Sequence, residues 1–186
     1  MNRREAVQHI TLLLGGTIAG STFFLAGCKS ESGKKLAFAP DDAAYLDEIA
    51  DTILPDTKTP GAKAAKVGSF MIVMVNDCYD EKDQKTFLDG MQKLNDLSKK
   101  TYNKSFVESS TQQRHDLLVQ LDKEQKDYMK NKKKEDPSHY FRLMKELTLL
   151  GYFTSEIGCT QARRYVEVPG RFDGCIPYKK GDKAWA

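Results

Sequence analysis

Residues 137–153 read PSHYFRLMKELTLLGYF, a proline-led start followed by a regular apolar pattern. Phe141, Met144 and Leu147 recur every three residues, which places them on one face of an α-helix. The same apolar face is widened by Leu143, Leu150 and Phe153. The segment therefore predicts an amphipathic helix that begins behind Pro137 and Ser138.

Four upstream segments show the same helical spacing of apolar side chains. They cover residues 40–54, 67–78, about 83–99 and about 111–130. Signals for extended chain are absent until residues 165–170, which lead into a turn. The prediction is an all-α fold, an irregular bundle of about five helices with an extended C-terminal tail. Cys78 lies on the apolar stripe of the second segment, so we expect it in the core.

Residues 1–27 have the layout of a bacterial export signal. Arg3 and Arg4 precede an apolar stretch, residues 10–24, that is too short and too interrupted to predict a permanent membrane span. Residues 25–27 (LAG) then precede Cys28, which is the arrangement of a lipobox, whose cysteine receives lipid. The paired arginines favour twin-arginine export, with the general secretory route as the alternative. The competing interpretation of Cys28 is a small core residue in an uncleaved helix.

The remaining chain has the length of one domain. We divide it into a polar tether over residues 28–39, a helical domain over 40–178 and a polar tail over 179–186. The formal net charge of the full chain is only +3, with both signs of charge spread along it. That balance argues against a nucleic-acid-binding protein.

Residues typical of catalysis are scarce beyond the signal. Only His115 and His139 remain among the histidines, and their settings favour a surface or helix-capping role over that of a base. The chain has no hydrolase, zinc-protease or nucleotide-binding motif, and its cysteines lack metal-ligand spacing. We therefore expect no catalytic residue, metal site or cofactor-binding site in this chain.

Three non-helical stretches are more distinctive than any catalytic pattern. Residues 53–62 read ILPDTKTPGA, residues 151–158 read GYFTSEIG, and residues 168–175 read VPGRFDGC. Their order and spacing resemble those of the gluconate 2-dehydrogenase subunit 3 family, over roughly residues 42–176. Members carry an export signal, whereas the lipobox belongs to this sequence.

The resemblance implies a small accessory subunit of a flavin-dependent sugar, polyol or gluconate dehydrogenase. Its partner would be a GMC-type flavoprotein that holds FAD, with a cytochrome c as a candidate electron acceptor. The small subunit would assist folding and export of that partner, and the lipid at Cys28 would anchor both on the periplasmic side of a bacterial membrane. The alternatives are a stand-alone envelope lipoprotein that acts as a binding or scaffolding module and, less favoured, an enzyme in its own right.

The resemblance also suggests roles for cysteines and aromatic residues. Cys159 and Cys175 flank one short segment and are the favoured disulfide pair, with Cys78 left buried. In the competing arrangement Cys159 or Cys175 bonds the large subunit. Aromatic anchors are common at interfaces, and the candidates are Tyr152, Phe153, Tyr165 and Phe172, with Tyr178 and Trp185 in the tail. Core packing is the competing explanation for Tyr152 and Phe153, and disorder is the competing one for Tyr178 and Trp185.

Overall fold

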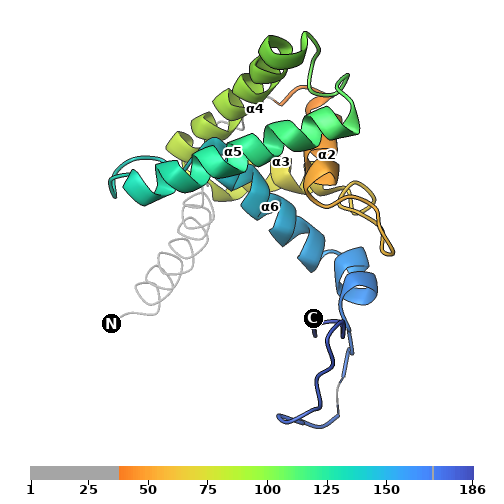
Figure 1. The fold of residues 1–186 in the computed structure, drawn as a ribbon. Helices are drawn as coiled ribbons and strands as arrows, with labels where there is room; N and C mark the ends of the chain where they lie inside the picture. The colour runs from red at the N-terminus through yellow and green to blue at the C-terminus, as the bar shows by residue number, and fades with distance from the viewer. Residues whose placement is uncertain (1–37, 169) are drawn as a thin grey trace, which may run out of the picture. The chain divides into compact units, whose positions relative to one another are not determined.

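The computed structural model describes residues 38–168 and 170–186. Within them the α-helices are α2 (Asp42–Ile53), α3 (Val67–Cys78), α4 (Glu81–Tyr102), α5 (Thr111–Asn131) and α6 (Tyr140–Thr154), followed by a π-helical turn, η1 (Gly158–Ala162) (Figure 1). The described residues form no strand beyond one isolated bridge between Arg164 and Trp185. The predicted all-α fold and its five helical segments are confirmed. The expectation that residues 151–158 are non-helical is wrong, because α6 continues through Thr154 and η1 begins at Gly158.

Side-chain caps explain where three of the helices begin. Asp80 accepts a hydrogen bond from the Asp83 amide (2.8 Å) at the start of α4. Ser110 and Gln113 form a reciprocal capping box at the start of α5. The Nδ1 atom of His139 accepts from the Phe141 amide (3.2 Å) at the start of α6. Each cap satisfies backbone donors that have no partner inside the helix.

Helix α6 is the central element, because it contacts α2, α3, α4 and α5. Its buried residues Phe141, Met144 and Leu147 belong to one continuous core. The other helices supply the rest of that core, including Leu46, Ile49, Val67, Met71, Phe87, Leu94, Leu117 and Leu121. The apolar stripe of residues 137–153 therefore positions the whole bundle.

Helices α2 and α3 approach each other closely at Gly68. A Cβ atom at this position would overlap the backbone carbonyl oxygen of Ala43. The Gly68 amide in turn donates to the Asp47 carboxylate (2.7 Å), so a residue of α2 serves as the cap of α3. Asp47 thus has a structural role at the helix contact.

An ion-pair network joins α2 to the loop before α3 and to α5. The Glu48 carboxylate contacts the Lys63 ammonium (2.5 Å) and the Arg114 guanidinium. Arg114 also donates to the backbone carbonyls of Ser109 (3.0 Å) and Val107. These donors lower the pKa of Glu48, with the Lys63 hydrogen bond as the main cause. The carboxylate is therefore ionised at neutral pH and holds three segments together.

The expectation that Cys78 lies in the core is wrong. Its thiol is exposed and lies 3.9 Å from the Met74 sulfur. Helix α3 ends at Cys78 itself, so no following turn covers the side chain. The apolar stripe of α3 is buried at Val67, Met71 and Val75, and its last buried residue lies three positions before the cysteine.

Among the helices of the described residues, none combines the length and the hydrophobicity needed to cross a bilayer.

Candidate partner-binding surface

The loop between α2 and α3 is held in one conformation by its own polar groups. The Gly61 amide donates to the Asp56 carboxylate, and the Ala62 amide donates to the Leu54 carbonyl (2.9 Å). A Cβ atom at Gly61 would stand 2.6 Å from the Leu54 carbonyl oxygen, so only glycine fits this turn. The loop is thus rigid although much of it is exposed.

The end of α6 docks against this loop. The Tyr152 hydroxyl donates to the Pro60 carbonyl at 2.6 Å, across 92 positions of sequence. Next to it, Gly151 leaves room for the Phe70 ring of α3, which a Cβ atom would approach to 2.6 Å. The two stretches 53–62 and 151–158 are therefore in direct contact.

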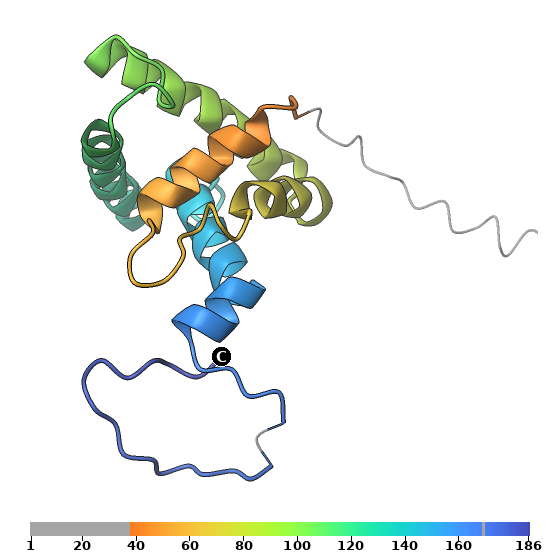
Figure 2. The same ribbon diagram turned by 90° about the vertical axis from the view of Figure 1, so that its right-hand side faces the viewer.

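After η1 the chain forms a long loop whose two ends are fastened together (Figure 2). The Arg164 amide donates to the Ala184 carbonyl (2.8 Å), and the Ala186 amide donates to the Arg164 carbonyl (3.0 Å). The Arg164 guanidinium donates to the Lys183 carbonyl (2.7 Å) and lies 4.6 Å from the centroid of the Trp185 ring. We call this arrangement of Arg164 with residues 183–186 the clasp, and residues 165–182 the C-terminal loop.

The C-terminal loop exposes many large apolar side chains. Phe172 is 96% exposed and lies between Gly170 and Gly174. The absence of a side chain at Gly174 leaves room for the Phe172 ring, which a Cβ atom there would approach to 3.1 Å. The other exposed apolar residues of the loop are Tyr165, Val166, Val168, Ile176 and Tyr178. An exposed apolar surface of this kind is typical of an interaction site.

A model of the family described as gluconate 2-dehydrogenase subunit 3 matches residues 40–170, most of the chain. The chain belongs to this family. Comparison with curated proteins and with solved structures gave no match. Membership in the gluconate 2-dehydrogenase subunit 3 family makes the chain a small subunit of a dehydrogenase complex, which implies a catalytic partner.

The family match ends at residue 170, so residues 171–182 of the C-terminal loop lie beyond it. The predicted domain, residues 40–178, begins where the match begins. Residues 179–186, assigned above to a polar tail, include residues 183–186, which pair with Arg164 in the clasp. In this member of the family, the last residues of the chain thus complete the loop that the matched region starts.

The structure divides the four predicted interface residues. Tyr152 is only 4% exposed and belongs to the core, whereas Tyr165 and Phe172 are well exposed. Phe153 is half-buried, and its ring lies 4.6 Å from the Arg163 guanidinium. Three of the four are therefore accessible to a partner. Sequence reasoning did not identify Val166, Val168 and Ile176 as part of this surface. The alternation of Val166 and Val168 with polar Glu167 nevertheless indicates that the two valines lie on one face.

Cys159 and Cys175 are free thiols in the structure, as is Cys78. The Cys159 sulfur contacts the Phe153 carbonyl oxygen at 3.3 Å, and Cys175 lies exposed on the C-terminal loop. The Cys159–Cys175 disulfide is not formed here and stays a prediction.

Both histidines occupy the kinds of position expected of them. His115 is exposed on α5, and His139 is the N-cap of α6. In the part of the chain that the structure describes, no three histidine, cysteine or carboxylate side chains are grouped so that they could hold a metal ion. Arg3, Arg4 and Cys28, with the export signal, lipid attachment and most of the tether, lie outside the described residues.

Proposed function

We propose that this chain is the non-catalytic small subunit of a membrane-tethered, flavin-dependent dehydrogenase of the periplasm that acts on a sugar, polyol or gluconate. It would assist the folding and export of a GMC-type catalytic subunit that binds FAD, and the lipid at Cys28 would anchor the complex. Electrons would pass from the flavin to an acceptor such as a cytochrome c.

The observation that carries the proposal is the clasped C-terminal loop. A loop that exposes Phe172, Val168 and Tyr178 to solvent gains free energy when a partner covers them. The clasp holds the loop closed in the free chain, which reduces the conformational entropy lost on binding. Phe172 is the natural anchor, since large aromatic side chains dominate the energetics of interfaces.

Co-expression with a GMC-type flavoprotein of the same organism tests the proposal. Purification through a tag on this chain is expected to retain the flavoprotein, visible by its flavin absorbance and by its mass in a stable complex. Recovery of a colourless chain with no flavoprotein would contradict the proposal and favour the stand-alone envelope lipoprotein.

A matched pair of variants locates the contact. Phe172→Ala is expected to weaken the complex by about 2 kcal/mol, roughly 30-fold in Kd, because it removes an anchor. Val73→Ala changes an exposed apolar residue of α3 outside the loop and is expected to leave the Kd unchanged. Equal effects of the two substitutions would place the interface elsewhere.

A further inference from the structure

A cavity of about 520 Å³ opens between α4, α5 and the segment that leads into α6. A pocket of this volume accommodates one small molecule. The residues that line it come from positions 86–97, 124–128 and 137–140, and none of them belongs to the C-terminal loop. The cavity is therefore separate from the proposed partner contact.

Three aromatic rings, those of Tyr128, His139 and Tyr140, form part of the cavity wall. The rings of His139 and Tyr140 stack with their centroids 4.5 Å apart, and His139 is only 9% exposed. The Tyr128 ring lies 5.6 Å from His139, and its hydroxyl donates to the Pro137 carbonyl (3.0 Å). This hydrogen bond fixes the wall at the entrance to α6.

His139 presents a hydrogen-bond donor to this cavity. Its Nδ1 atom accepts from the Phe141 amide, so in the neutral ring the proton resides on Nε2. Burial lowers the pKa of His139 below its usual 6.5, which keeps the ring neutral at pH 7. Nε2 is 3.6 Å from the Glu124 carboxylate, which is too long for a hydrogen bond. The Nε2–H group is thus available to a ligand.

Charged side chains of both signs line the exposed part of the cavity. Asp89 and Lys93 come from α4, and Glu124 comes from α5. Among the described residues, neither Asp89 nor Lys93 has a side-chain ion-pair or hydrogen-bond partner. A carboxylate and an ammonium that remain unpaired beside one cavity are free to bind polar groups of a ligand.

We propose that this cavity binds a neutral polyhydroxylated molecule, a monosaccharide or a linear polyol. A hydroxyl group both donates and accepts, so neighbouring hydroxyls match the carboxylates of Asp89 and Glu124 on one side and the Lys93 ammonium on the other. The carbon-bound hydrogens of such a molecule would lie against the edge of the stacked His139 and Tyr140 rings. An anion would meet two carboxylates, and a small zwitterion would leave the edge of the aromatic stack uncovered.

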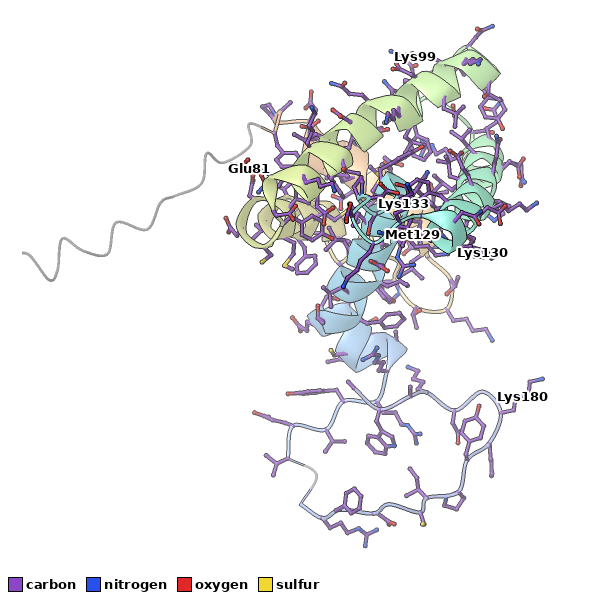
Figure 3. All side chains as sticks on the ribbon, turned by 90° about the vertical axis from the view of Figure 1, so that its left-hand side faces the viewer. Glu81, Lys99, Met129, Lys130, Lys133 and Lys180 are labelled. Atoms are coloured by element: carbon purple, nitrogen blue, oxygen red, sulfur yellow. The ribbon has the colours of Figure 1, made fainter. Side chains whose placement is uncertain are left out.

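Saturation-transfer NMR on the mature chain tests the site, with sorbitol and D-glucose as probes. We expect saturation transfer to at least one probe and a Kd near the millimolar range. Lys93→Ala and Asp89→Asn are each expected to weaken binding about tenfold, because each removes a charge-assisted hydrogen bond. Lys99→Ala is the matched control, since Lys99 lies on α4 outside the cavity lining (Figure 3).

Three results would overturn the proposal. The first is no saturation transfer from the unaltered chain to either probe. The second is equal binding by the Lys93→Ala and Lys99→Ala chains. The third is displacement of the bound probe by glycine at a concentration below that of the probe itself. The last result would identify a zwitterion site. Circular dichroism of each variant confirms the helical fold, which these exposed substitutions are expected to leave intact. Because the test uses this chain alone, its result does not depend on the proposed function.

Discussion

Deletion of residues 183–186 is expected to open the C-terminal loop without harming the helical bundle. The deletion removes both backbone hydrogen bonds of Arg164, the bond from its guanidinium to Lys183 and the contact with Trp185. Neither Arg164 nor residues 183–186 contribute to the buried core. The bundle therefore keeps all of its packing, and only the loop loses its closure.

The size of the effect follows from the length of the loop. Holding the two ends of a segment of about 20 residues together costs roughly 3 kcal/mol of chain entropy at 25 °C. In the intact chain the clasp offsets this cost before the partner arrives. In the shortened chain binding must bear it, so the Kd for the catalytic subunit is expected to rise by about 100-fold.

Two measurements separate loop opening from general destabilisation. Hydrogen exchange is expected to accelerate at the Arg164 amide, whereas amides of the α6 core keep their protection. The thermal midpoint is expected to fall by less than about 2 °C, since no core contact is lost. Trp185→Phe keeps an aromatic ring and all backbone bonds of the clasp, and serves as the conservative control. An unchanged Kd after the deletion would refute the reasoning, and so would loss of α6 protection.

Four further outcomes are expected. Arg114→Met should lower the free energy of unfolding in urea by about 2 kcal/mol, whereas Lys63→Met should cost under about 1 kcal/mol, because the Arg114 side chain is 16% exposed and that of Lys63 is 55% exposed. The stability that the ionised Glu48 carboxylate contributes is complete above its ordinary pKa of 4.5 and should be lost as the pH falls through the lowered pKa of the folded chain. If a Glu48→Gln chain loses stability with acid in the same way as the unaltered chain, the prediction is contradicted. Gly68→Ala should cost about 2 kcal/mol by forcing α2 away from α3, measured by the same unfolding assay. Cys28→Ala should abolish lipid labelling and release the protein from the membrane fraction; retained membrane binding would argue for a different anchor.

The helices were accessible to sequence reasoning because helical periodicity and caps are local properties. The stripe over residues 137–153 predicted α6 to within a residue at either end, and the segment 67–78 coincides with α3. Burial at the end of a helix is less local. Cys78 fits the periodic pattern of α3, but its exposure depends on where the neighbouring helices stop.

The candidate partner surface was only partly predictable. Phe172 stood out because it is an aromatic residue in a glycine-rich turn, and the structure leaves it exposed. Tyr152 carries the same aromatic signal, yet its hydroxyl bonds Pro60 from 92 positions away. The clasp likewise depends on a pairing of Arg164 with Trp185 across the loop. Long-range contacts of this kind leave no periodic trace in the sequence.

The central position of α6 has a consequence for the order in which the chain folds. Helices α2 and α3 are made early in synthesis, but part of the apolar surface of each helix becomes buried only when it packs against α6. The Pro60 carbonyl likewise gains its hydrogen bond only after Tyr152 has been made. Contacts so distant in sequence form late, since the intervening chain must first be made and then closed into a loop. The bundle is therefore completed only after the ribosome has released α6, long after the N-terminal residues have emerged.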